Sequence, residues 1–196
     1  MNKSENKKRG RKNVEKRLID SAAYLVGSVG PNQLTIRDIA EHAGVNHAQI
    51  HHYFGGKAKL LEETYKQLAI EHVEQFKNKN ISINNLGNQP LSSGLINNYY
   101  QAIIRAVLDG ELDLAKLQIE SNLSMSKELL SQLAASKNLD KPTPEMKSAI
   151  ALGLVIEFGL AAMEDYIEDL LDMDEDDKKM FMKLFIEARQ IGLNKI

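Results

Sequence analysis

Residues 34–54, LTIRDIAEHAGVNHAQIHHYF, restrict the fold more than any other part of the sequence. They contain two short helical patterns joined across AGVN. Thr35 is a predicted N-cap, and Asp38 is placed to complete a capping box. Gly44 provides the residue that tolerates a positive φ in a tight turn, and Ile50 provides an apolar anchor that faces back across it. The segment therefore predicts a helix-turn-helix.

Helical periodicity continues through most of the remaining sequence, and strand signals are nearly absent. A segment rich in Asn, Gly and Ser, residues 78–94, is predicted to be a loop. The sequence predicts an all-α fold with an N-terminal three-helix helix-turn-helix domain and a C-terminal helical bundle. The predicted parts are a basic flexible arm (1–12), the helix-turn-helix domain (13–56) and the helical body (57–196). Helices in the second half are expected at about 95–109, 112–138, 143–171 and 175–194.

Charge is distributed unevenly along the chain, although its net charge is only −2. Residues 1–60 contain eleven Lys and Arg against five Asp and Glu, whereas the remaining residues contain fourteen against twenty-two. A basic front on an acidic body favours a polyanion as the partner of the front. A basic run that is merely solvated would look the same, so the charge alone does not decide the function.

The composition is that of a soluble cytoplasmic protein. The chain has no cysteine, which excludes disulfides and thiolate metal sites and suits a reducing compartment. Its N-terminus is charged and lacks the apolar core of a secretory signal. The longest apolar stretch is interrupted by Glu157 and is shorter than the ~20 residues that span a bilayer, so no membrane partner is expected.

Four of the five histidines lie between residues 42 and 52. With Ile50 facing inward, helical periodicity turns most of HAQIHH outward, where a major groove can accept the helix. The alternative is a zinc site, because His47 and His51 have i,i+4 spacing. Zinc usually needs three or four protein ligands, and neither cysteine nor an HExxH pattern is present. We therefore expect a DNA-facing surface with no metal, no cofactor and no catalytic residues.

The segment LTIRDIAEHAGVNHAQIHHYFGGKAKLLEETY resembles the DNA-binding region of TetR-family transcriptional regulators. That family has T-x-x-x-I-A-x-x-A-G-V-S, a short helix ending in Tyr-x-x-Phe, and a Lys followed by Leu. The resemblance covers about residues 12–65. It departs from the family pattern at Asn46, where Ser is frequent, and at His51, which replaces a Tyr that commonly binds phosphate.

The resemblance implies specific contacts with double-stranded DNA. Thr35 and Lys57 should bind phosphates, Arg37 and the outward residues of the second short helix should face the groove, and either His51 or Tyr53 should hold the backbone. The basic arm can follow the backbone or enter the minor groove. The expected DNA-binding residues are Arg9, Arg11, Lys12, Thr35, Arg37, Asn46, His47, Ala48, Gln49, His51, His52, Tyr53 and Lys57.

For the acidic body, the resemblance implies a small-molecule inducer and a homodimer. The last two helices, 143–171 and 175–194, are the expected dimer surface, with a pseudo-palindromic operator whose half-sites lie ~34–36 Å apart. An intramolecular core would give the same apolar pattern. The small residues expected at that surface are Gly153, Gly159, Ala161 and Ala162. The candidate ligand-binding residues are Tyr99, Tyr100, Arg105, Gln118, Asn122, Met125 and Tyr166.

Glu157 stands out in its apolar surroundings. It shares a helical stripe with Glu164 and Glu168, which predicts a solvated edge. Taken together, the sequence predicts a regulator that represses transcription until a ligand releases it from its operator, and no enzymatic activity. The alternative is an all-helical ligand-binding or protein-interaction module that does not bind DNA.

Overall fold

The structure is a computed structural model that describes residues 3–82, 91 and 97–193. These residues form nine helices and no strand, which confirms the predicted all-α class. They pack into two compact units, residues 1–71 with 101–123 and residues 72–100 with 124–196. The predicted boundary between residues 56 and 57 is drawn between a DNA-binding part and a ligand-binding part. It does not coincide with a boundary of these two units, and it remains a prediction.

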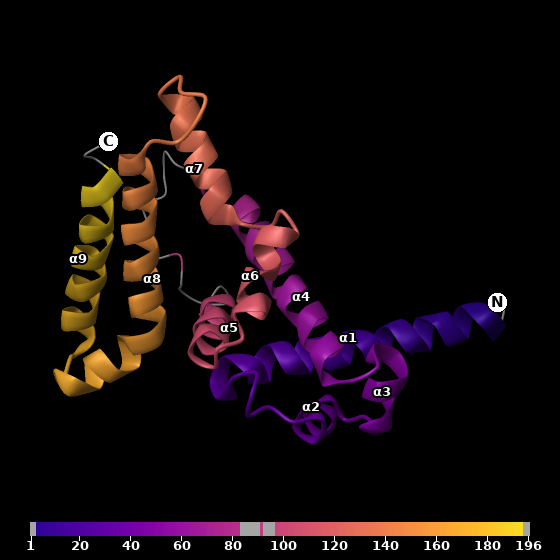
Figure 1. Cartoon of the computed structure of the whole chain (residues 1–196). Helices are drawn as coiled ribbons and strands as arrows, with labels where there is room; N and C mark the ends of the chain where they lie inside the picture. Colours follow the sequence, from indigo (N-terminus) through magenta and orange to yellow (C-terminus); the bar gives the residue numbers. More distant parts are fainter. Residues whose placement is uncertain (1–2, 83–90, 92–96, 194–196) are drawn as a thin grey trace. The chain divides into compact units, whose positions relative to one another are not determined.

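The first unit contains the predicted helix-turn-helix, and its short helices lie beside a long first helix (Figure 1). Its elements are α1 (Lys3–Val29), α2 (Ile36–Ala43), α3 (Ala48–Phe54), most of α4 (Lys57–Asn78), the end of α5 (Asn97–Leu108) and α6 (Leu112–Glu120). Residues 3–12, expected as a flexible arm, are helical here and form the first turns of α1.

The core of the first unit is made by one apolar face from each helix. The inward positions of α1 are completely buried, as are the predicted anchor Ile50 and Ile39 of α2. Burial of such side chains is the main favourable contribution to folding and fixes the crossing of α2 and α3. The completely buried apolar side chains are Leu18, Ala22, Val26, Leu34, Ile39, Ile50, Leu60, Ala102 and Ala106.

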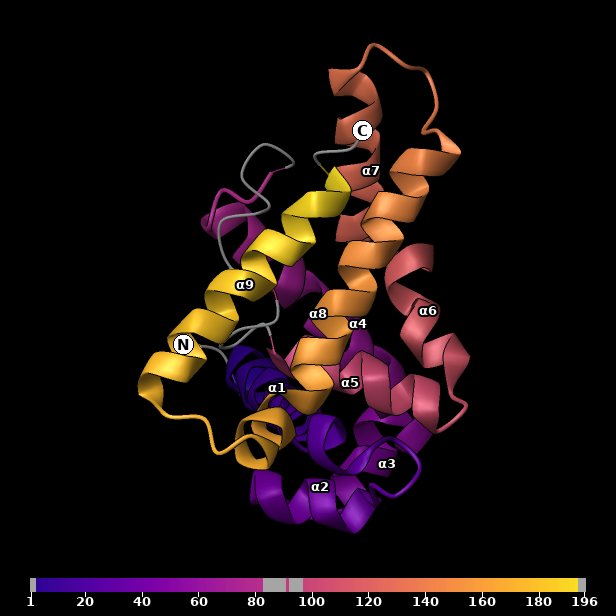
Figure 2. The same ribbon diagram turned by 90° about the vertical axis from the view of Figure 1, so that its left-hand side faces the viewer.

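The second unit is built around two long antiparallel helices that lie side by side in both views (Figures 1 and 2). Its elements are the end of α4, the start of α5, α7 (Met125–Ser136), α8 (Pro144–Leu170) and α9 (Glu175–Leu193). Thr143 caps α8 by accepting a hydrogen bond from the Met146 N–H at 3.3 Å, and Pro144 is the first helical residue.

The single helix predicted over residues 112–138 is wrong, because two helices occupy that range. Asn122 adopts a left-handed conformation with φ 55°, and the N–H of Leu123 returns to the Gln118 carbonyl at 2.7 Å. This bonding satisfies carbonyls at the end of α6 and ends the helix there. The chain then restarts as α7 after Ser124. The predicted loop 78–94 lies largely outside the described residues.

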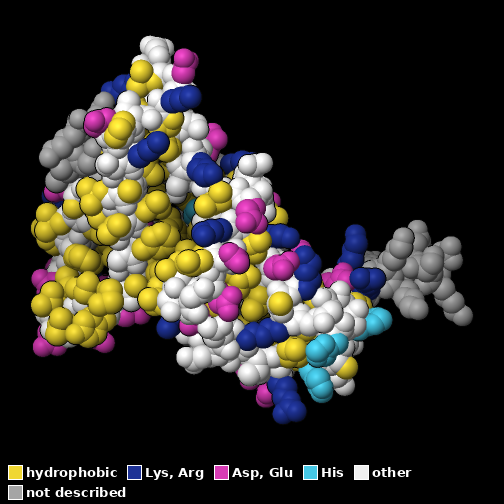
Figure 3. Space-filling view, viewed as in Figure 1, with side chains coloured by type: hydrophobic (Ala, Val, Ile, Leu, Met, Phe, Trp, Pro, Cys, Tyr) yellow, Lys and Arg dark blue, Asp and Glu magenta, His cyan; other side chains and the backbone are white. Residues whose placement is uncertain are grey.

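An apolar face, here called the α8–α9 face, is exposed to solvent in the single chain. Figure 3 shows hydrophobic side chains gathered over these two helices. Of the small residues predicted there, Gly159 and Ala162 are exposed, but Ala161 is buried and Gly153 lines a cavity. By length and composition alone, α8 also meets the criteria for a membrane-spanning helix. The α8–α9 face consists of Leu152, Val155, Met163, Tyr166, Leu170, Met180 and Leu184.

Candidate nucleic-acid interface and ligand cavity

The first helix of the helix-turn-helix starts at the predicted capping box. The Thr35 hydroxyl oxygen accepts from the Asp38 N–H at 3.2 Å, and the Asp38 carboxylate accepts from the Thr35 N–H at 2.9 Å. The Thr35 hydroxyl also donates to this carboxylate at 2.6 Å. These hydrogen bonds from Thr35 lower the pKa of Asp38. Thr35 is exposed but engaged with Asp38, so its first role is to begin α2.

The turn between α2 and α3 has the conformation that the sequence predicts. Gly44 has φ 62°, and the Val45 N–H donates to the Ala40 carbonyl at 2.9 Å. The sequence analysis did not identify Arg17 of α1, whose guanidinium donates to the carbonyls of Ala43 and Gly44. Arg17 thus ties the turn to α1, and this contact spans 26 residues of sequence.

The second helix of the motif, α3, follows Asn46 and is anchored by Ile50. The Asn46 side-chain oxygen accepts from the Ala48 N–H at 2.8 Å and so binds one of the free backbone donors at the start of α3. Ile50 is completely buried, whereas Phe54 at the end of the helix is only half-buried. Gly55 ends the helix with φ 77°. These contacts hold seven residues of α3 at the surface of the first unit.

The outward side of α3 has the predicted histidines. His47, Ala48, His51 and His52 are exposed, and Figure 3 shows the histidine side chains gathered on one surface with lysines and arginines nearby. Gln49 is half-buried, and its side-chain oxygen is buried without a hydrogen-bond partner among the described residues. The imidazole groups are therefore available to a partner.

The start of α1 contacts α3 through Tyr53. The Arg11 guanidinium lies over the Tyr53 ring at 5.5 Å from its centroid, and the His52 ring packs edge-on against Tyr53 at 4.9 Å. Arg11 also forms an ion pair with Glu15 at 2.7 Å. Tyr53 is half-buried by these neighbours, whereas His51 is exposed. Lys12 is exposed, and the Arg9 side chain lies outside the described part of the structure.

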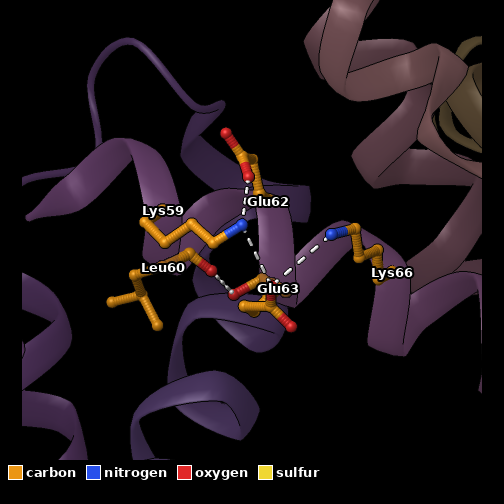
Figure 4. A network of polar contacts seen from close by, with 6 residues as sticks. Lys59, Leu60, Glu62, Glu63 and Lys66 are labelled. Carbon is orange, nitrogen blue, oxygen red and sulfur yellow. Dashed lines mark hydrogen bonds and ion pairs between the residues drawn. The ribbon is translucent and has the colours of Figure 1, made fainter. Parts of the chain in front are cut away.

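At the start of α4, Lys57 is distinguished from the lysines that follow it. Lys59 contacts the carboxylates of Glu62 at 2.7 Å and Glu63 at 3.3 Å, and Lys66 also approaches Glu63 (Figure 4). Lys57 instead donates to the Asn32 backbone carbonyl at 3.3 Å. The charges of Lys59 and Lys66 are locally balanced by these carboxylates, whereas the Lys57 ammonium group contacts a neutral carbonyl. Arg37, in the first turn of α2, is exposed.

Asp109, which the sequence analysis did not identify, fixes the connection between α1 and α2. Its carboxylate accepts from the Asn32 N–H at 2.9 Å, and its backbone carbonyl accepts from the Asn32 side-chain amide at 3.0 Å. Asn32 in turn accepts from Lys57. The end of α5 is therefore hydrogen-bonded to a residue that also positions Lys57. No local sequence pattern indicates this contact, because it joins residues 77 positions apart.

Among the described residues, no group of three or more His, Asp or Glu side chains could hold a metal ion. His42 contributes to packing instead. Its ring stacks on Tyr24 of α1 at 5.0 Å between centroids. The histidine pattern of the first unit is thus an exposed set on α3 and one stacked ring on α2.

The second unit contains a cavity of about 480 Å³, counting its open mouth. Most of its lining is apolar, and its polar side chains come from the end of α4, the start of α5, α7, α8 and α9. A mainly apolar lining with a few polar groups is typical of a small-molecule site. It is lined by His72, Phe76, Leu91, Tyr100, Met125, Ser126, Leu129, Ala149, Ile150, Gly153, Leu154, Glu157 and Arg189.

The prediction that Glu157 lies on a solvated edge is wrong. Its side chain is 1% exposed, forms an ion pair with Arg189 of α9, and accepts from the Leu91 N–H at 3.0 and 3.1 Å. The polar partners come from segments far away in sequence, which local periodicity does not indicate. Ion pairing and hydrogen bonding together allow the charge to be buried.

The structure brings only some of the candidate ligand-binding residues to the cavity. Tyr100 and Met125 line it, and Tyr99 is buried against His72, which the sequence analysis did not identify as a site residue. Tyr166 is 58% exposed on the α8–α9 face. The remaining candidates, Arg105, Gln118 and Asn122, belong to the first unit and do not line this cavity.

Comparisons with known proteins identify the first unit most clearly. Residues 18–64 match the family model of bacterial regulatory proteins, tetR family. The chain is 47% identical over 53 residues to the HTH-type transcriptional regulator BetI of Agrobacterium fabrum, which is 27% of this chain and 26% of that protein. It is 46% identical over 54 residues to the regulator of the same name from Brucella anthropi, covering 28% of each chain. The chain thus matches about a quarter of the length of these relatives.

Solved structures share the fold over most of the chain. A transcriptional regulator from Rhodococcus sp. Rha1 superposes with a TM-score of 0.63 at 16% identity, covering 91% of this chain and 96% of that one. A TetR-family regulator from Vibrio parahaemolyticus gives a TM-score of 0.54 at 18% identity, covering 89% and 97%. At these identities the likeness concerns the fold.

Proposed function

Because this chain belongs to the TetR family by its DNA-binding region and its fold, we propose that it is a sequence-specific DNA-binding transcriptional regulator. The observation that carries the proposal is the surface of α3. Its buried anchor Ile50 and the hydrogen bond of Asn46 at its start hold an exposed row of histidines on the same unit as Arg37 and Lys57. Such a helix matches the major groove in width and in hydrogen-bonding groups.

In the proposed complex, α3 enters the major groove of double-stranded DNA. Gln49 is the residue suited to adenine, because its amide can donate and accept at once. Lys57 and the free N–H groups at the start of α4 bind phosphate, and either His51 or Tyr53 holds the backbone nearby. The basic start of α1 adds contacts that depend on charge but not on base sequence.

Selection of bound sequences from a random DNA pool tests this proposal. On the selected operator, Gln49→Ala is expected to reduce affinity by about 1–3 kcal/mol and to relax the preference at one base pair. Lys57→Ala should weaken binding to all sequences and lower the slope of log affinity against log salt by about 1. Lys116→Ala, an exposed lysine on α6, is the matched control and should leave both quantities unchanged. No enrichment of any sequence from the pool would refute the proposal.

We further propose that the protein is a repressor released from its operator by a small molecule. The cavity of the second unit provides a site for this ligand. A ligand that binds one conformation of the chain more tightly shifts the population toward that conformation. Release follows if this conformation no longer fits the operator, and it is tested by measuring operator affinity with and without ligands that fill the cavity.

The α8–α9 face supports a homodimer as the DNA-binding species. An exposed apolar patch on a soluble protein marks an interaction surface, and a second copy covers it with the same residues. Two heads related by two-fold symmetry would meet half-sites ~34–36 Å apart on a pseudo-palindromic operator. This assignment also accounts for the apolar composition of α8 without a membrane, because Glu157 of the same helix is buried in an ion pair.

Charge placed on the α8–α9 face tests the dimer. Val155 is 68% exposed in the single chain, so Val155→Asp should leave the fold intact but disfavour burial against a second copy. Sedimentation is expected to show a monomer for this variant and a dimer for the wild type. Leu139→Asp, at an exposed apolar residue between α7 and α8, is the control. A dimer of unchanged stability in Val155→Asp would place the interface elsewhere.

The proposed regulator acts in the cytoplasm, where its operator is accessible, and performs no catalysis. The competing function is a helical ligand-binding or protein-interaction module without DNA binding. The DNA pool distinguishes the two functions. A regulator should select an operator whose binding depends on Gln49 and Lys57, whereas a module without DNA binding should select none.

A further inference from the structure

Among the described residues that line the cavity of the second unit, the one acidic and the one basic side chain are paired with each other. Glu157 and Arg189 are both almost completely buried and are in contact with each other. The Leu91 N–H adds one bifurcated hydrogen bond to the two oxygens of the Glu157 carboxylate. Burial, together with the nearby Glu157, raises the pKa of Tyr100, so this hydroxyl keeps its proton. A ligand in this cavity therefore meets neutral surroundings overall.

His72 is the polar side chain of the cavity for which neither hydrogen-bonding atom has a partner among the described residues. Its side chain is 4% exposed, and both ring nitrogens are buried without a hydrogen-bond partner in the described part of the chain. The ring stacks on Tyr99 with centroids 4.1 Å apart and lies against Phe76 at 4.7 Å. These contacts fix the orientation of the imidazole at the cavity wall.

Burial also decides the protonation of this imidazole. It lowers the pKa of His72 to about 4, so the ring is neutral at physiological pH. A neutral imidazole has one N–H donor and one nitrogen acceptor. Buried polar groups without a partner are costly, and a ligand that supplies a hydrogen bond to His72 is favoured by removing part of that cost.

We propose that the ligand of this cavity is a small neutral molecule, mainly apolar, with one hydroxyl or carbonyl group that hydrogen-bonds to His72. The proposal rests on the proposed function, in which this cavity holds the releasing ligand. A carboxylate ligand would place a second buried negative charge beside Glu157, and the two carboxylates would have to share the one guanidinium of Arg189. A cationic ligand would be repelled by the positive charge of Arg189, and Glu157 cannot fully compensate for it because its carboxylate is already paired with Arg189.

Four probes of nearly equal size and different chemistry test the proposal on the full chain without DNA. They are benzyl alcohol, toluene, benzoate and benzylamine, with binding measured by titration calorimetry. One hydrogen bond to His72 should make benzyl alcohol bind about three- to tenfold more tightly than toluene. Benzoate and benzylamine, which are charged at neutral pH, should bind at least about tenfold more weakly than benzyl alcohol.

Substitution of His72 locates the hydrogen bond. His72→Phe keeps a flat ring against Tyr99 but removes both nitrogens, so benzyl alcohol should fall to the affinity of toluene while toluene is unchanged. His42→Phe, at an exposed stacked ring of the first unit, is the matched control. In wild-type protein, the ¹⁵N signals of the His72 ring should shift with benzyl alcohol and not with toluene. This measurement does not depend on whether the variant folds.

Tighter binding of either charged probe, an undiminished preference for benzyl alcohol in His72→Phe, or binding of none of the four probes would overturn the proposal. Operator affinity is then measured with benzyl alcohol present. If the alcohol binds as expected but DNA stays bound, the ligand class stands and release by this cavity fails. If a charged compound releases the operator by binding in the cavity, release stands and the neutral class is wrong.

Discussion

Replacing Glu157 by leucine is expected to destabilise the second unit by about 3–5 kcal/mol, although it places an apolar residue in an apolar helix. The substitution leaves the Arg189 guanidinium 2% exposed without its carboxylate. It also removes the acceptor for the Leu91 N–H. A buried cation without its anion loses hydration without the attraction that compensates for it.

The double variant separates the effect of the charge from that of packing. Removing both members of a buried ion pair for apolar residues of similar volume is often neutral or even stabilising by about 1–4 kcal/mol. Glu157→Leu with Arg189→Met should therefore be much more stable than Glu157→Leu alone. Since Leu91 still lacks its acceptor, about 1 kcal/mol of destabilisation should remain. The two substitutions should thus be coupled by about 3 kcal/mol or more, beyond additive behaviour.

Urea unfolding of the wild type, both single variants and the double variant completes the cycle. Far-ultraviolet circular dichroism follows the helices, and several protein concentrations separate unfolding from dimer dissociation. The reasoning about the buried pair is refuted if Glu157→Leu costs less than about 1 kcal/mol, or if the double variant is as unstable as the sum of the singles.

Three further substitutions have measurable outcomes. Asn46→Ala removes the cap from the Ala48 N–H and should cost about 1 kcal/mol in urea unfolding, whereas Asn46→Ser should recover most of it. Burial lowers the pKa of His72 from 6.5 to about 4 in the folded chain. As the pH falls below 6.5, His72 is therefore protonated in the unfolded chain before it is protonated in the folded chain, and this favours unfolding. Wild type should therefore lose up to about 3 kcal/mol between these pH values that His72→Phe does not lose; parallel profiles would contradict this. Asp109→Ala removes the carboxylate that accepts from the Asn32 N–H, so the free energy of unfolding should fall by about 1 kcal/mol. Operator binding in gel-shift assays should also weaken. If neither quantity changes, the contact of Asp109 with Asn32 is dispensable.

The helix-turn-helix was predictable because the residues that form it act on their near neighbours in the sequence. Thr35, Gly44 and Asn46 each act on backbone groups within a few residues, through a cap or a left-handed φ. Ile50 follows from helical periodicity alone. The contact of Arg17 with the same turn was not predictable, because it joins α1 to residues 26 positions away.

The break between α6 and α7 has local causes that the periodicity of residues 112–138 obscured. An Asn can also occur inside a helix, so its presence does not predict a helix end. Here Asn122 ends α6 because it adopts a positive φ. Apolar residues on both sides keep the helical spacing, so the pattern continues through the interruption.

The sequence by itself determined the helical class, the helix-turn-helix and the outward side of α3, because these depend on spacing and on hydrogen bonds between near neighbours. Only the tertiary structure decided what surrounds Glu157 and His72. A glutamate in an apolar helix is compatible with a solvated edge or with a buried ion pair, and the choice depends on whether a distant arginine faces it. A histidine on the apolar side of α4 likewise becomes a candidate ligand contact only when the helices around it leave both ring nitrogens at a cavity wall.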